Sequence, residues 1–158
     1  VKIKLHLNEY DEGVMSDFQK ELILEEINEL PPLEKGQVSI NGIYTFDMGD
    51  KLEVSVYLRN GLAKQINFEK VPLVIVNNNG DVLAKQTMDM KELGTLPPLS
   101  ARPYKVYFDK NNVLIDKLSK DDWKIQFEQS ITAVNTVKVE FEGFPGYLHH
   151  ERSGRAHV

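Results

Sequence analysis

Hydrophobic and polar residues alternate with a period of two along much of this 158-residue chain. The clearest case is residues 51–59. One side of this segment carries Leu52, Val54, Val56 and Leu58, and the other side carries Glu53, Ser55, Tyr57 and Arg59. Such alternation is typical of a strand with one buried face. We therefore expect the first set in the core and Tyr57 among the outward side chains.

The same alternation predicts several more strands. Three of them follow the rule closely, at residues 1–7, 123–128 and 137–141. Weaker patterns, separated by Gly, Pro and Asn, predict strands at residues 38–46, 63–68 and 104–108.

A hairpin is expected where residues 73–76 and 82–86 flank Asn77-Asn78-Asn79-Gly80-Asp81. Asn and Gly tolerate the positive φ that tight turns require. The same segment has some resemblance to a calcium loop, but that loop's distal glutamate is missing, since position 86 is a glutamine. The hairpin is the better interpretation.

Helix is scarce in the pattern. Ser16 and Gln19 have the spacing of a capping box, which predicts a short helix beginning with a turn at residues 16–20. Residues 22–28 fit a helix and a strand equally well. Residues 90–93 allow one helical turn at most, ended by Gly94.

These elements add up to eight to ten short strands and one short helix near the N-terminus. We expect a mainly β fold, an antiparallel β-sandwich that is immunoglobulin-like in outline. The length suits one domain, placed at residues 1–142. Residues 143–158 begin at the breaker cluster Gly143-Phe144-Pro145-Gly146 and are expected to form a flexible tail, either native or vector-derived.

Composition excludes several classes of protein. No apolar run approaches the roughly 18 residues needed to cross a bilayer, so we expect no transmembrane segment. The net charge is -5, and residues 1–36 hold 9 acids against 4 bases while the rest of the chain holds 15 of each. Without a basic field, we expect no nucleic-acid partner. The chain has no cysteine, which rules out a thiol nucleophile and a disulfide.

The residues of catalytic chemistry are thinly spread. Of the four histidines, His6 lies on the polar side of a strand and the other three lie in the tail, where His149-His150-Glu151 lacks a rigid scaffold for a metal. Asp47 and Asp50, and likewise Asp121 and Asp122, are explained by turns. We expect a non-enzymatic protein with no catalytic residues, no cofactor and no metal.

Surface recognition remains open. The edge strands of a sandwich have unpaired N–H and C=O groups that can accept an extended peptide. Arginine and aromatic side chains anchor many interfaces, and the interaction candidates are Arg59, Arg102 and Tyr104, with Tyr107 and Trp123 of the same residue types. We expect Arg102, beside Pro103 in a loop, to be exposed and Trp123 to lie in the core.

Several short segments in consistent order are similar to one family. They are Asn28-Glu29-Leu30-Pro31-Pro32-Leu33, Gly36-Gln37-Val38-Ser39-Ile40-Asn41-Gly42-Ile43, Arg59-Asn60-Gly61-Leu62, Phe68-Glu69-Lys70-Val71-Pro72-Leu73, Leu93-Gly94 and Ser100-Ala101-Arg102-Pro103-Tyr104. Together they resemble the SLAP domain of S-layer assembly proteins in the accessory Sec system of Gram-positive bacteria. The similarity runs from about residue 5 to residue 128.

The resemblance implies a non-enzymatic accessory factor for the export of S-layer proteins. The implied partners are a secretion ATPase or translocon and an S-layer client protein. The implied location is the cytoplasm, free or peripherally bound at the inner face of the cell membrane. The alternative is a structural or ligand-binding module of the cell envelope that holds polysaccharide or cations. The oligomeric state is left open.

Overall fold

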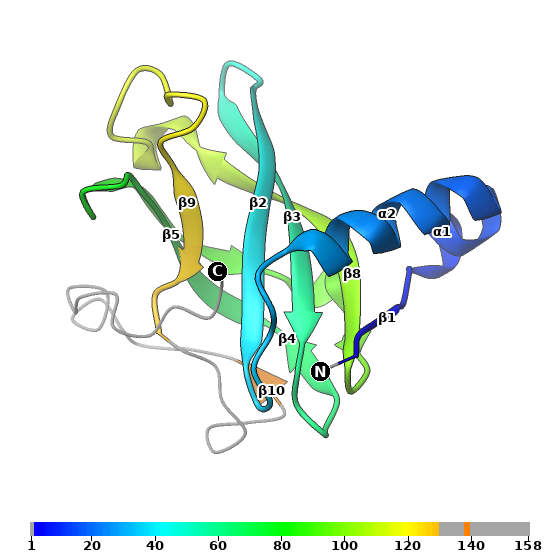
Figure 1. Cartoon of the computed structure of the whole chain (residues 1–158). Helices are drawn as coiled ribbons and strands as arrows, with labels where there is room; N and C mark the ends of the chain where they lie inside the picture. Colours follow the sequence, from blue (N-terminus) through cyan, green and yellow to red (C-terminus); the bar gives the residue numbers. More distant parts are fainter. Residues whose placement is uncertain (1, 130–137, 140–158) are drawn as a thin grey trace.

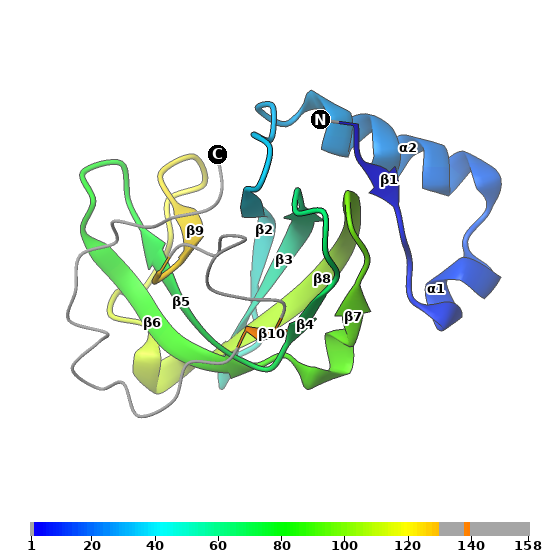
Figure 2. The same ribbon diagram turned by 90° about the horizontal axis from the view of Figure 1, so that it is seen from below.

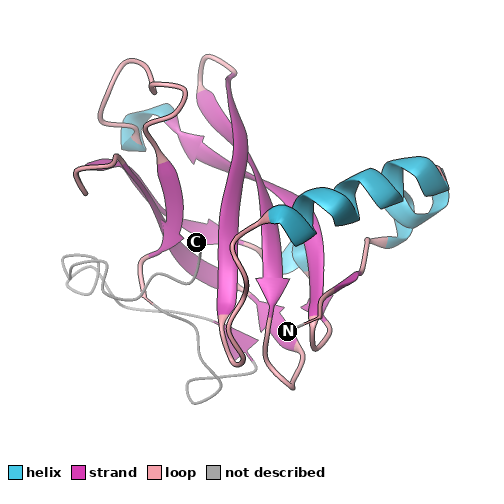
Figure 3. Cartoon of the chain, viewed as in Figure 1, coloured by secondary structure: helices cyan, strands magenta, loops and turns pink. Residues whose placement is uncertain are grey.

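The fold is mainly β, and the two α-helices found among the described residues lie near the N-terminus (Figure 3). The computed structural model describes residues 2–129 and 138–139. Its strands form open, largely antiparallel sheets in a sandwich-like arrangement, so the predicted fold class is confirmed. The predicted tail at residues 143–158 lies outside the described residues.

The elements have the following bounds. The helical ones are α1 (Glu9–Val14), α2 (Asp17–Glu29) and two 3-10 turns, η1 (Lys91–Leu93) and η2 (Lys110–Asn112). The strands are β1 (Lys4–Leu5), β2 (Val38–Asp47), β3 (Lys51–Asn60), β4 (Ile66–Phe68), β5 (Lys70–Val76), β6 (Val82–Asp89), β7 (Thr95–Leu96), β8 (Ser100–Asp109), β9 (Lys124–Phe127) and β10 (Lys138–Val139).

Three sheets organise these strands. Their orders are β1-β8-β3-β2, β6-β5-β9 and β10-β4-β7. The four-stranded sheet and the sheet of β5, β6 and β9 form the two main layers (Figures 1 and 2). At one side the layers meet, since the Gln86 amide of β6 donates to the Tyr107 carbonyl at 3.3 Å and accepts from the Asp109 N–H at 2.8 Å.

The main core lies between these two layers. Leu52, Val54, Val56 and Leu58 are all buried in it, as the alternation in β3 predicts. The facing layer contributes Leu73, Ile75, Ile125 and Phe127, and the Phe127 ring stacks on Phe68.

The other face of β3 differs from the prediction. Tyr57, expected outward, is only 6% exposed and belongs to a second cluster with Ile27, Leu33 and Ala101. The reason is that α2 covers this part of the outer face of the sheet. The Tyr57 hydroxyl donates a hydrogen bond to the Glu26 carboxylate of α2. Burial and this hydrogen bond both raise the pKa of Tyr57.

Helix α2 is longer than the predicted first turn, and residues 22–28, which fitted two structures, are helical. The predicted capping box is present: Ser16 Oγ accepts from the Gln19 N–H at 3.1 Å, and Gln19 Oε1 accepts from the Ser16 N–H at 2.9 Å. The short helix α1 was not predicted. It buries none of its side chains, so it leaves no apolar periodicity in the sequence.

Some strand bounds also differ. The strand predicted at residues 1–7 is reduced to β1, because the parallel pairing with β8 covers only Lys4 and Leu5. The weak pattern at residues 104–108 is the end of the long central strand β8. The predicted hairpin joins β5 and β6, and Asn77 Oδ1 holds its turn by accepting from the N–H groups of Asn79 at 3.0 Å and Asp81 at 2.9 Å.

Candidate functional site

The buried side chain of Arg102 holds separate segments of the fold together by hydrogen bonds. The expectation that it is exposed is wrong: it is 5% exposed and lies in β8, not in a loop. Its Nε donates to the His6 carbonyl at 2.8 Å, its Nη1 donates to the Leu93 carbonyl, and its Nη2 contacts His6 Nδ1 at 2.6 Å. Burial lowers the pKa of Arg102. The guanidinium thus joins the N-terminal segment to the turn before β7.

Arg59 has a similar structural role and is 3% exposed. Its Nε donates to Ser39 Oγ at 3.0 Å, and its Nη1 donates to the Pro31 carbonyl at 3.0 Å. Its Nη2 reaches Asn41 Oδ1 at 3.3 Å. Burial lowers the pKa of Arg59. These contacts fasten the segment after α2 to β2, so neither arginine is an exposed anchor.

Tyr104 and Trp123 are half-buried and pack against the main core. Burial, followed by the nearby Glu92 and Asp89 carboxylates, raises the pKa of Tyr104. Trp123 lies over Gly42 in β2 and packs against the main core, but it is partly exposed and not one of the buried core residues.

One member of each acidic pair, Asp47 and Asp122, accepts a backbone hydrogen bond in a turn or loop, as the sequence predicts. Asp47 accepts from the Gly49 N–H at 2.8 Å and pairs with Lys110 at 2.8 Å, and both contacts lower the pKa of Asp47. Asp122 accepts from the Asn78 N–H at 2.7 Å. Within the described part of the chain, no group of three or more His, Cys, Asp or Glu side chains could hold a metal ion. The tail histidines lie outside it.

The surface that stands out is the end of the four-stranded sheet that α2 leaves uncovered. Tyr44 and Phe46 of β2 lie there, with Tyr107 of β8, and Phe46 is 58% exposed. We call these three residues the aromatic face. They share one face because Tyr44 pairs with Ser55, Phe46 with Glu53, and Glu53 in turn with Tyr107 across β3.

A β-bulge places the two β2 aromatics on this outer face. Val38 and Ile40 point into the core, and strict alternation would send Tyr44 and Phe46 to the same side. The register shifts between Gly42 and Tyr44, which reverses the alternation beyond that point.

The aromatic face has a polar centre at Glu53. The Tyr107 hydroxyl donates to Glu53 Oε1 at 3.2 Å, and Lys105 Nζ lies 3.9 Å from Glu53 Oε2. Partial burial and the hydrogen bond to Glu53 raise the pKa of Tyr107. Planar rings around a satisfied charge pair are well suited to burying area at low entropic cost.

Among the described residues, no strand pairs with the β2 edge beside this face, and we call this the open edge. β2 ends its sheet, and backbone groups of alternate residues point to opposite sides of a strand. The carbonyls of Leu99 and Ala101 accept backbone hydrogen bonds from the β1 side. The odd-numbered residues of β8 therefore direct their backbone N–H and C=O groups away from β3. The registers of β8 with β3 and of β3 with β2 then fix the orientation of β2. The backbone groups of Tyr44 and Phe46 bond to β3, whereas the N–H and C=O of Thr45 point to the open edge. An extended peptide can pair there.

Sequence reasoning missed Tyr44 and Phe46, although it named Tyr107. The available signal was the pair of aromatics two residues apart after Gly42, in a segment where glycine marks a bulge.

Comparison with known proteins supports the resemblance seen in the sequence. The model of one family, the SLAP domain, matches residues 5–129, from β1 to just past β9. No curated protein and no solved structure was found to match the chain. Among the described residues, no helix is both long and apolar enough to cross a bilayer.

Proposed function

The chain belongs to the SLAP domain family, and from this premise we propose that it binds proteins during accessory-Sec-dependent export and assembly of S-layer proteins. The family's designation links it to this context. The proposed partners are the S-layer client and the secretion ATPase or translocon of a Gram-positive bacterium. The protein acts without catalysis, in the cytoplasm or at the inner face of the membrane.

The observation that carries the binding role is the aromatic face beside the open edge of β2. An unfolded export client is an extended chain with unpaired backbone groups. Strand addition at Thr45 satisfies such groups whatever the client's sequence, while Tyr44, Phe46 and Tyr107 offer area for its apolar side chains. This combination suits a binder of many unfolded segments.

The proposal is tested by export in a host that makes an S-layer. Deletion of the gene is expected to leave S-layer protein inside the cell, and a wild-type copy restores export. A Tyr44→Ser/Phe46→Ser copy is expected to restore it poorly, because the exposed rings are lost while the core is untouched. The matched control is Tyr44→Phe/Phe46→Tyr, which keeps the aromatic area and restores export.

Two results count against the proposal. Unchanged export in the deletion strain contradicts the secretion role. Full restoration by the serine variant contradicts the assignment of the aromatic face. Cell fractionation of the wild-type protein checks the location, and recovery in the wall fraction favours an envelope module instead.

A further inference from the structure

The helical arm, residues 9–29 with α1 and α2, runs past β8 at the side of the sheet (Figures 1 and 2). It buries little of itself against the rest of the chain: α1 has no buried residue, and Ile27 is the one in α2. A cavity of about 410 Å³ separates α1 from the sheet, with Asn8, Asp11 and Met15 on one wall and Pro103 and Lys105 on the other. Core packing therefore explains the C-terminal half of α2 but not α1 or the start of α2.

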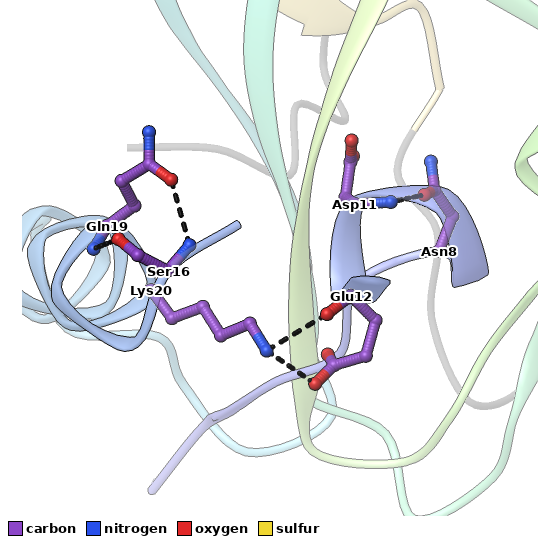
Figure 4. A network of polar contacts seen from close by, with 6 residues as sticks. All are labelled: Asn8, Asp11, Glu12, Ser16, Gln19 and Lys20. Carbon is purple, nitrogen blue, oxygen red and sulfur yellow. Dashed lines mark hydrogen bonds and ion pairs between the residues drawn. The ribbon is translucent and has the colours of Figure 1, made fainter. Parts of the chain in front are cut away.

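Polar contacts hold the arm in its shape (Figure 4). Asn8 Oδ1 caps α1 by accepting from the Asp11 N–H at 2.7 Å. The Ser16 and Gln19 capping box begins α2. Lys20 Nζ joins the two helices by contacting the Glu12 carboxylate at 2.7 Å and the Glu12 carbonyl at 3.2 Å. A six-residue helix is unstable alone, so these contacts keep a defined surface that residues 2–129 do not cover.

The exposed surface of α2 has an apolar half and an acidic half, and it lies opposite the side that packs on the sheet. The inner side of α2 carries Ile23, Ile27 and Leu30, which pack on the sheet. The outer side of α2, about 150° around the helix axis from this inner side, carries Phe18, Leu22, Glu25 and Glu29 in that order along the helix. Phe18 is 68% exposed, Leu22 is 45% exposed, and both glutamates are exposed. We call these four residues the outer stripe.

The negative charge of the helical arm indicates which kind of partner is complementary to it. The arm holds eight acidic residues and one base, Lys20, which is already paired with Glu12. A second copy of the arm, an anionic membrane or a nucleic acid would meet repulsion there. A cationic amphipathic helix is complementary, with its apolar side chains on Phe18 and Leu22 and its Lys or Arg side chains opposite Glu25 and Glu29.

We infer that the outer stripe of α2 is a docking site for a basic amphipathic helix of a partner protein. The site is separate from the aromatic face, and it stands whether or not the export role holds. The probe is a synthetic helical peptide of leucine and lysine with a fluorophore at one end, and its anisotropy is measured with the full chain. Saturable binding is expected, and it weakens as salt rises, because exposed charge pairs are screened.

Two variants separate apolar docking from simple charge attraction. Phe18→Ala/Leu22→Ala keeps every charge and uses the best helix former, so the arm stays folded. Glu25→Gln/Glu29→Gln keeps the apolar pair. Each is expected to weaken peptide binding by about tenfold or more. The matched control is Leu114→Ala, an exposed apolar side chain after η2 that belongs to neither the arm nor the aromatic face, and it is expected to bind the peptide as wild type does.

Several outcomes overturn the inference. They are no peptide binding, equal binding by wild type and Phe18→Ala/Leu22→Ala, or an equal loss in Leu114→Ala. Sedimentation velocity adds a further check. If the wild-type protein is a dimer and Phe18→Ala/Leu22→Ala is a monomer, a second copy of the chain covers the outer stripe. Circular dichroism of each variant verifies that the helices remain.

Discussion

At the scale of single residues, the two buried arginines show how the N-terminal segment is attached to the sheet. Arg59 and Arg102 both donate to backbone carbonyls of segments that precede β2: Pro31 in one case and His6 in the other. A guanidinium has five donors in a rigid plane, so one side chain can hold several strands of chain together.

Replacement of Arg102 is therefore expected to affect folding. Arg102→Ala leaves the buried carbonyls of His6 and Leu93 without their donor, and we expect a loss of about 3 kcal/mol in the free energy of unfolding. Lys105→Ala, an exposed change in the same strand, is expected to cost about 0.5 kcal/mol or less. Urea denaturation measures both, and equal losses would contradict the tying role of Arg102.

Gly42 tests the packing of β9 on β2. A Cβ at this position would lie 2.5 Å from the Cη2 and Cζ3 atoms of Trp123, so the indole must move. Gly42→Ala is expected to cost about 1 to 3 kcal/mol and to shift the fluorescence of the chain's single tryptophan.

Gly13 in α1 is the matched control for this change. A Cβ there meets no atom within 4 Å. Because alanine favours a helix over glycine, Gly13→Ala is expected to stabilise α1 by about 0.5 to 1 kcal/mol. The same sign of change in both variants would show that one of the two environments is wrongly described.

At the scale of elements, the helical arm depends on its caps. Ser16→Ala removes the acceptor for the Gln19 N–H, which is expected to cost α2 about 1 kcal/mol. Amide hydrogen exchange at the start of α2 should accelerate about fivefold, while the amides of β3 keep their protection. Ser119→Ala, in a loop, is the control. An arm whose exchange does not change would show that the capping box is not what holds it.

The edge of β2 is tested by proline. Thr45→Pro removes an N–H that points away from β3, so no bond of the sheet is lost and the melting temperature should change little. Phe46→Pro removes an N–H that bonds β3 and is expected to cost about 3 kcal/mol. We expect Thr45→Pro to impair export despite its stable fold. Equal destabilisation by the two prolines would contradict the assigned strand orientation.

Much of the sheet architecture follows from local pattern. The core side of β3 and the turn at Asn77 were predictable, because each depends on residues close in sequence. The outer side of β3 was not, because Tyr57 and Arg59 are buried by α2 and by the segment after it. A polar side chain that packs under a distant element has the same local pattern as an exposed one.

The candidate site was less predictable than the fold. The general idea of an open edge strand was available from the sequence. The particular edge was not, since it depends on which strand ends the sheet and on a one-residue bulge at Ile43. Arg102 was placed at the surface because Pro103 suggested a loop. Proline is tolerated in β8 because β1 covers only Ser100 and Ala101, which leaves the edge at Pro103 open.

At the scale of the whole molecule, the protein presents two unlike surfaces. The aromatic face and the open edge of β2 are neutral and suited to extended chain, whereas the helical arm is acidic and suited to a basic helix. Under our two proposals, a client would occupy the first surface and a second protein the other, so that the domain would link components of an export system.

The central claim is that the aromatic face contacts protein partners during export, and site-specific photocrosslinking in cells tests it most directly. A photoreactive amino acid is placed at Phe46, with Lys64, an exposed position in the loop between β3 and β4, as the control. The attached proteins are identified by mass spectrometry. We predict crosslinks from position 46 to an S-layer protein or a component of the secretion machinery, and few from position 64. Equal crosslinking at the two positions, or none at position 46, would contradict the claim.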